Sequence, residues 1–164
     1  MLIAANWKMN LGKSEIDQFS KILQSNEFHD SLDICIFPPS VYINYLNTRI
    51  ENLPISIGAQ NCYHEFSGAF TGEVSPTSLK DIGCKYVLVG HSERRVNNNE
   101  SNLHVKKCRS SAINSDLIPI ICVGETFKER EKAWKASIAK EQRANLVTKE
   151  GLLERLRSTI QEEE

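Results

Sequence analysis

The sequence predicts an α/β fold in which the strands run parallel in one sheet. Apolar runs of strand length recur along the chain with helical patterns between them, a rhythm typical of repeated strand–helix units. The runs are continuously apolar and do not alternate with polar residues, as expected for parallel strands buried on both faces. Polar residues follow each run, which marks the strand ends.

The predicted strands leave room for one helix in each crossover, so right-handed strand–helix–strand connections account for the whole pattern. They are Leu2–Ala5, Ile34–Phe37, Ile55–Ala59, Tyr86–Val89 and Ile118–Val123.

The first two helices are predicted from their start signals. Ser14 is the expected N-cap of a helix over Glu15–Leu23, with Asp17 three residues later as a weak capping box. Pro39 precedes a second helix that we expect to begin at Val41.

Three further helices complete the pattern. Pro76 opens a short helix, and Gly83 can end it in a left-handed conformation. Helical periodicity then predicts helices over 99–112 and 126–146. The sequence alone leaves open whether the sheet is an open doubly wound one or part of a closed barrel. No G-x-G-x-x-G or P-loop motif follows the first strand, which disfavours a dinucleotide or P-loop fold.

Composition excludes several classes of function. The 164 residues fit one domain, and the net charge is −1, with 20 basic against 21 acidic side chains. That balance gives no reason to expect a nucleic-acid or membrane partner. No apolar run approaches the roughly 18 residues of a membrane span.

Cysteine usage indicates a reducing compartment. The five cysteines are odd in number and show no C-x-x-C spacing, which favours free thiols over a disulfide framework. The first residues show no signal peptide. We therefore expect a cytoplasmic protein.

The polar residues after the strands are candidates for a functional site, because the carboxyl ends of parallel strands meet at one edge. The first strand runs into Lys8, the fourth into His91 and Glu93, and the fifth into Glu125. Taken singly, Lys8 is an ordinary surface lysine and His91 a structural histidine. Together they would bind an anion and move protons.

Five motifs, in order, resemble the triosephosphate isomerase family over roughly residues 2–132. They are Asn6–Asn10 (NWKMN), Gly58–Asn61 (GAQN), Gly68–Glu73 (GAFTGE), Val89–Arg95 (VGHSERR) and Cys122–Glu125 (CVGE). The resemblance implies a partial TIM (β/α)8 barrel of about five β/α units, followed by a divergent helical tail. We accordingly expect two parts, 1–132 and 133–164.

The resemblance also implies roles for these residues. Lys8 would bind the substrate phosphate and Asn6 would orient the substrate beside it. His91 would polarise the carbonyl as a neutral imidazole, and Glu93 would support Lys8 electrostatically.

The resemblance also implies supporting roles for further residues of the motifs. The resemblance places Cys122, Glu125 and Arg95 behind the site. It places Thr71 near the tip of a dimerisation loop, 60–74, so a homodimer is implied.

No cofactor or metal is implied. The histidines His29, His64 and His104 show no metal-ligand spacing with each other or with the cysteines, and we interpret them as surface or structural.

The catalytic base has no match in the sequence. In the family it is a Glu after the sixth strand, in a segment resembling A-Y-E-P-V-W-A-I-G-T-G, and the phosphate-binding glycine loops come later still. In this sequence the resemblance to the family ends after Arg130. The tail that follows contains apolar residues at helical spacing over 151–164. Asn102 replaces a familiar Asp. We expect a truncated barrel with unpaired edge strands, prone to aggregate or to need a partner.

Three functions remain open at this stage. The first is a triosephosphate isomerase, interconverting dihydroxyacetone phosphate and glyceraldehyde 3-phosphate in glycolysis and gluconeogenesis, with these 164 residues inactive alone. The second is a non-catalytic remnant, and the third is an interaction module built on the 60–74 loop and the tail.

Overall fold

The computed structural model describes residues 1–29, 31–125 and 128–140. It contains two compact units, Met1–Val123 and Gly124–Glu164. The predicted boundary between 132 and 133 stays a prediction. The helix predicted over 151–164 lies outside the described residues.

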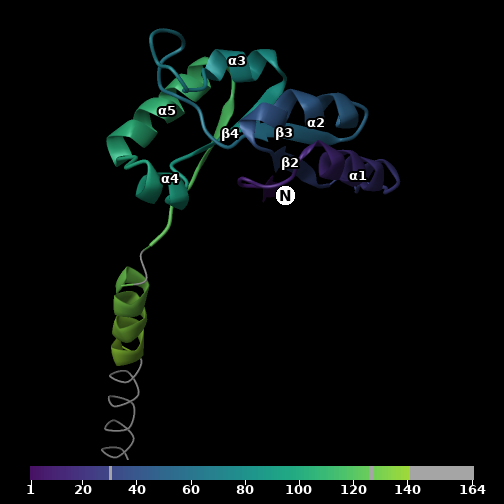
Figure 1. The fold of residues 1–164 in the computed structure, drawn as a ribbon. Coiled ribbons are helices and arrows are strands. Elements are labelled where there is room, and N and C mark those ends of the chain that lie inside the picture. Colours follow the sequence, from purple (N-terminus) through teal and green to yellow (C-terminus); the bar gives the residue numbers. More distant parts are fainter. Residues whose placement is uncertain (30, 126–127, 141–164) are drawn as a thin grey trace, which may run out of the picture. The chain divides into compact units, whose positions relative to one another are not determined.

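The first unit is built on one sheet of five parallel strands in sequence order (Figure 1). Each strand pairs in parallel with the next along the chain, which confirms the predicted half of a β/α barrel. The strands are β1 (Leu2–Asn6), β2 (Asp33–Phe37), β3 (Ile55–Ala59), β4 (Cys84–Val89) and β5 (Ile118–Ile121).

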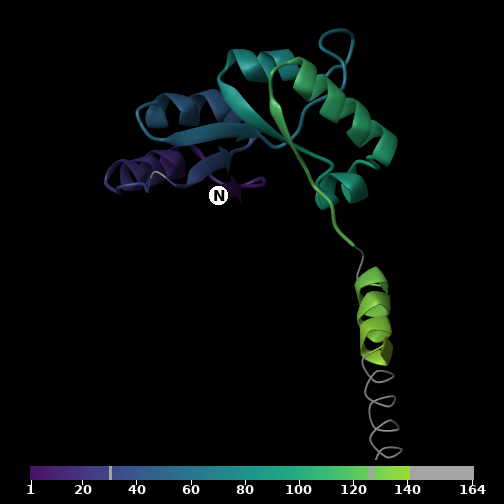
Figure 2. The same cartoon turned by 180° about the vertical axis from the view of Figure 1, so that it is seen from behind.

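One helical segment or more fills each crossover, and the helices cover one side of the curled sheet (Figures 1 and 2). They are α1 (Lys13–Gln24), η1 (Ser40–Tyr42, a 3-10 turn), α2 (Ile43–Ile50), α3 (Pro76–Asp81), α4 (Ser92–Asn97) and α5 (Asn102–Asn114). Gly83 follows α3 with a φ of 91°, as predicted.

The start of α1 differs from the prediction that Ser14 is its N-cap. Gly12 is the N-cap, and its N–H donates to Glu15 Oε2 at 2.7 Å, so Ser14 lies inside the helix. Glu15 therefore does the capping that was expected of Asp17. Asp17 instead accepts hydrogen bonds from Tyr45 and Arg49 of α2. These bonds lower the pKa of the Asp17 carboxyl, chiefly through Arg49.

Two other helix boundaries also differ from prediction. The chain after Pro39 forms a 3-10 turn before α2 begins at Ile43, two residues later than expected. The fifth helix starts at Asn102 and not at 99, because Ser101 caps it by accepting from His104 N–H at 3.2 Å. Asn99 has a φ of 54°, which no α-helix allows.

The second unit contains a helix over 128–140, part of the helix predicted over 126–146. Glu131 and Lys135 form an ion pair one turn apart, at 2.7 Å. Residues 126–127 and 141–146 lie outside the described residues. Among the residues that the structure describes, no helix has the length and apolarity to cross a membrane.

Alternate residues of β2 and β4 face two separate apolar layers. The layer on the helix side is the larger, and its strand members include Ile36, Ile57 and Val87. The layer on the opposite, concave side is formed by Cys35, Phe37, Tyr86 and Leu88, with Ile120 and Cys122 packed against it. Each layer contains fully buried side chains, since Phe37 and Val87 are each 0% exposed.

Gly58 allows Phe37 to cover the middle of the concave face. A Cβ on Gly58 would lie 2.2 Å from Cε1 of the Phe37 ring. The ring therefore occupies the volume that a side chain on β3 would need. The glycine of the GAQN motif is required here for space.

We expect Gly58→Ala to destabilise the first unit by about 1–3 kcal/mol, because the added methyl overlaps a buried aromatic ring. Urea denaturation of the whole chain measures this loss. In a Phe37→Leu background the same substitution should cost less. Gly124→Ala, whose Cβ would meet nothing within 4 Å, is the control. An equal cost in both backgrounds would contradict the role of the ring.

The two outer strands each pair on one side only within the described sheet, as predicted. Large apolar side chains on them are exposed. Leu2 and Ile3 on β1 are 40% and 41% exposed, and Ile118 and Ile121 on β5 are 48% and 44% exposed. Unpaired backbone beside exposed apolar side chains is a template for association with other chains.

We expect the chain to self-associate through these edges. An Ile3→Lys/Ile118→Lys double variant should lower the weight-average mass in sedimentation equilibrium, because charge on an edge strand disfavours strand addition. Val41→Lys replaces a residue of η1 that is 78% exposed, away from both edges, and should leave the mass unchanged. A monodisperse monomer before any substitution would contradict the expectation.

Candidate functional site

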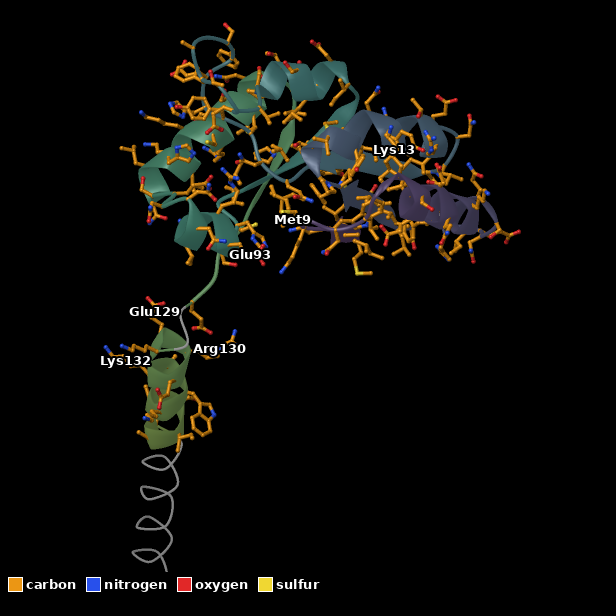
Figure 3. All side chains as sticks on the ribbon, in the orientation of Figure 1. Met9, Lys13, Glu93, Glu129, Arg130 and Lys132 are labelled. Carbon is orange, nitrogen blue, oxygen red and sulfur yellow. The ribbon has the colours of Figure 1, made fainter. Side chains whose placement is uncertain are left out.

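The side chains of Lys8 and Glu93 meet at the carboxyl end of the sheet. Lys8 follows β1, and Glu93 lies in the first turn of α4, after β4. Lys8 Nζ lies 2.6 Å from Glu93 Oε1, and the two side chains are 54% and 49% exposed. Figure 3 labels Glu93 and Met9, the neighbour of Lys8, at this edge. The structure thus brings together two residues 85 positions apart.

The backbone of Lys8 is held in an uncommon conformation. Its φ is 55°, a left-handed value that costs a non-glycine residue about 1–3 kcal/mol. Asn6 offsets part of this cost, because its Oδ1 accepts from the Lys8 N–H at 2.9 Å. The polar turn that follows β1 therefore aims the lysine across the sheet edge.

Gln60 fixes the same turn from β3. Its Nε2 donates to the carbonyl oxygens of Lys8 and Phe37, both at 2.8 Å. Sequence reasoning placed Gln60 in a motif but gave it no role. The feature of the sequence that could have indicated this role is the position of Gln60 directly after the buried strand β3, whose end lies beside the ends of other strands.

His91 is the N-cap residue of α4 and is held as a hydrogen-bond acceptor. Its Nδ1 accepts from the Glu93 N–H at 3.3 Å. Nδ1 is thus the acceptor nitrogen of the ring, and Glu93 Oε2 lies 3.6 Å from the same atom, so Nε2 is the nitrogen left to donate. The His91 side chain is 23% exposed, so Nε2–H can serve a ligand at the rim.

The electrostatics of the site rest on the Lys8–Glu93 pair. The hydrogen bond from Lys8 lowers the pKa of the Glu93 carboxyl below its usual range, against a smaller opposing effect of desolvation. Glu93 is therefore ionised when the ammonium is charged. The pair leaves a cation at the rim that is oriented but still accessible.

Arg95 joins the elements behind His91. Its Nε donates to the Gly90 carbonyl oxygen and its Nη1 to Asn102 Oδ1, each at 2.7 Å. Gly90 has a φ of 70°, and a Cβ there would lie 2.7 Å from Val105 Cγ2 and 2.8 Å from Arg95 Nη2, so a side chain at this position would be strained. Asn102 is an uncharged amide, so its contact with Arg95 is a hydrogen bond to a neutral group.

A pocket of about 350 Å³ opens beside His91 and Glu93. Gln60 and Asn61 line it from the end of β3, and Glu73 lines it from the loop that precedes α3.

The remaining predicted residues lie apart from this ion pair or in the other unit. Thr71 is exposed on the 60–74 loop. Cys122 is half-buried against the concave layer, where burial raises the pKa of its thiol. Glu125 belongs to the second unit and pairs there with Arg130 at 3.0 Å.

A second cluster of polar groups lies away from these residues. His64, His104 and Cys108 offer ligand atoms that all lie within 4.8 Å of one another. No metal-ligand spacing was predicted for the histidines and cysteines, yet the fold brings these three side chains together. His104 and Cys108 are four residues apart on one helix, a spacing that the sequence already carried.

A cation, an imidazole and a carboxylate at the carboxyl edge of a parallel β/α sheet define a class of protein. They are typical of β/α-barrel enzymes that act on small anionic molecules.

Comparisons with known proteins identify the family within that class. The family model for triosephosphate isomerase matches residues 1–156. The triosephosphate isomerase of Dictyoglomus turgidum is 43% identical over 142 residues, 86% of this chain and 57% of the relative. That of Finegoldia magna is 45% identical over 130 residues, covering 79% and 52%. That of Endomicrobium trichonymphae is 42% identical over 145 residues, covering 88% and 58%.

The chain belongs to the triosephosphate isomerase family. It spans a little over half the length of these curated relatives.

We expect Lys8→Met to raise the pKa of the Glu93 carboxyl toward its ordinary value, because the ammonium is the main cause of its depression. NMR titration of the Glu93 carboxyl carbon measures the shift. The contribution of the pair to stability is present above the unfolded-state pKa and is lost as pH falls through the folded-state pKa.

Lys13→Met, which removes another lysine from the same region of sequence, is the control and should leave Glu93 unchanged. High salt should mimic part of the Lys8→Met effect, since the pair is half-exposed. The ion pair would be irrelevant to Glu93 if its titration were the same with and without Lys8.

Proposed function

We propose that this chain supplies the cation and imidazole of a triosephosphate isomerase site, for interconverting dihydroxyacetone phosphate and glyceraldehyde 3-phosphate. The observation that carries the proposal is the approach of Lys8 and Glu93 to 2.6 Å at the sheet edge, next to His91, whose Nδ1 accepts from the Glu93 N–H. Family membership supports the choice of substrate.

Lys8 would bind the anionic substrate. Its ammonium is paired with Glu93 yet 54% exposed, so it can also contact a phosphate or an oxygen that gains charge. The left-handed turn fixed by Asn6 and Gln60 sets where that charge points. A fixed cation stabilises developing negative charge without reorganising during the reaction.

His91 would polarise the substrate carbonyl. With Nδ1 occupied by the Glu93 N–H, Nε2–H is the donor that remains. Donation from a neutral imidazole to a carbonyl oxygen acidifies the neighbouring carbon and stabilises the enediolate. Arg95 would keep α4 in place for this, with Cys122 as a further supporting residue.

The proton between the two carbons requires a carboxylate base. No segment of the 164 residues resembles the one that carries the base in the family. The Glu93 carboxylate is paired with Lys8. We therefore propose that the base comes from polypeptide outside these residues, and that no metal or cofactor takes part in the isomerisation.

Finer features of the family are proposed with the activity. They are a place in glycolysis and gluconeogenesis, a cytoplasmic location, and a homodimer formed through the 60–74 loop. Support for the dimer lies in the exposure of that loop, where Phe66 and Phe70 are 44% and 39% exposed and Thr71 is open to a partner.

A chimaera tests the proposal. Residues 1–123 of this chain replace the matching part of the Dictyoglomus turgidum relative, and isomerase turnover is measured. Lys8→Ala should lower kcat/KM by about 100-fold or more, because it removes a fixed charge. His91→Gln should lower kcat by about 10²–10⁴-fold, because it removes the polarising donor.

Lys13→Ala in the same chimaera is the matched control and should keep full activity. The 164-residue chain alone should show no turnover above its Lys8→Ala variant. Chimaeras that stay fully active without Lys8 or His91 would refute the assigned roles, and turnover by the isolated chain would refute the missing base.

A further inference from the structure

The second polar cluster brings a loop and a helix together. His64 lies on the loop between β3 and α3, and His104 and Cys108 lie on α5. Both ribbon views show this loop projecting beside α3 and α5 (Figures 1 and 2). Residues 40 or more positions apart thus present their nitrogen and sulfur atoms to one point.

The two residues on α5 already stand at ligand distance from each other. Cys108 Sγ lies 3.3 Å from His104 Nε2, one helical turn away. Ligand atoms of a tetrahedral zinc site lie about 3.3–3.7 Å apart, from metal–nitrogen and metal–sulfur bonds of 2.0–2.3 Å. The helix therefore preforms one edge of such a tetrahedron.

His64 offers the third ligand atom. Its Nδ1 is enclosed and has no hydrogen-bond partner among the described residues. Its Nε2 faces Glu65 Oε1 at 3.7 Å. Metal-bound histidines usually present their second ring nitrogen to a carboxylate in this way. An enclosed nitrogen without a partner is costly, and a metal ion would satisfy it.

Aromatic packing holds the two imidazoles close together. Their ring centroids lie 5.4 Å apart, and the Tyr63 ring lies 4.2 Å from His64 and 6.1 Å from His104. Rings held in this way lose less freedom when they bind an ion.

Negative charge lies next to the cluster. Glu100 Oε1 is 3.9 Å from His104 Nε2, and its side chain is 5% exposed. Arg94 holds that carboxylate at 2.6 Å, which keeps it as a neighbour of the site and not a ligand.

We propose that His64, His104 and Cys108 form a binding site for one zinc-type transition-metal ion. Two imidazoles and one thiolate are the donors preferred by Zn²⁺ and its borderline-soft relatives, and they disfavour the oxygen-seeking Mg²⁺ and Ca²⁺. The thiol proton leaves to solvent as the sulfur–metal bond forms, and no electron is transferred. Three protein ligands leave a fourth position open to water.

Such an ion would tie the 60–74 loop to α5. At present that connection among the described residues rests on packing and on the weak contact from Cys62 Sγ to the Cys108 carbonyl oxygen, 3.8 Å. A bound ion adds coordinate bonds between the same two elements. The site lies outside the Lys8–His91–Glu93 group and does not depend on the isomerase assignment.

Titration of the reduced 164-residue chain with Co²⁺ tests the site. We expect one equivalent to bind with a thiolate-to-cobalt charge-transfer band in the near ultraviolet and tetrahedral ligand-field bands in the visible. Zn²⁺ should displace the Co²⁺ and raise the thermal unfolding midpoint. Absence of binding to the folded chain, or binding without the thiolate band, overturns the proposal.

Variants assign the ligands. His64→Ala and Cys108→Ser should each weaken binding by at least about 100-fold, since loss of even an outer partner of a metal site costs 10–100-fold. Cys108 is 3% exposed, so circular dichroism checks that its variant folds. His64 lies on a loop, so we expect the His64→Ala variant to fold. This variant therefore still tests the site if Cys108→Ser unfolds.

His29→Ala and Cys122→Ser are the matched controls. His29 lies in the α1–β2 connection and Cys122 follows β5, and neither belongs to the cluster. Both variants should bind Co²⁺ like the parent chain. Loss of the band in either control, or its survival in a folded His64→Ala variant, would place the metal elsewhere and overturn the assignment.

Discussion

The need to cover both faces of a parallel sheet governs this structure. Parallel strands leave no face that tolerates water well, so the chain must supply two apolar layers. On the convex side the crossover helices supply one. On the concave side Phe37, Tyr86 and Leu88 supply the other, and the absence of a side chain on Gly58 leaves room for the Phe37 ring over β3.

The arrangement of the candidate site follows from the same constraint. Because all described strands run in one direction, their carboxyl ends bring Lys8, Gln60 and His91 to one edge from distant parts of the sequence. The buried layers beneath hold these ends in place. The polar turns above them then fix orientation: Asn6 and Gln60 hold the left-handed Lys8, and the Glu93 N–H donates to Nδ1 of His91.

Much of the fold could be predicted from the sequence, because the apolar runs of the strands and the order of the motifs can be read directly along the chain. The strands, the parallel sheet and the short helix ended by Gly83 are confirmed. The N-cap of α1 was wrong because Gly12 and Ser14 both permit a helix start, and only the reach of Glu15 to the Gly12 N–H decides between them.

The metal-type cluster was missed for a different reason. The spacing of His104 and Cys108 was visible, but its third member lies on a loop whose path depends on tertiary packing around Tyr63. Ion pairing of Lys8 with Glu93 could be stated only through the family resemblance, because no local pattern links residues 85 positions apart.

The bonds of Gln60 make the site sensitive to a slow chemical change. One amide nitrogen donates to two carbonyl oxygens, of Lys8 and Phe37. Hydrolysis of that amide to a carboxylate would replace the donor by an acceptor, so that like partial charges would face each other at both contacts. The turn would lose its tie to β3, so deamidation at one position would loosen the turn that holds Lys8.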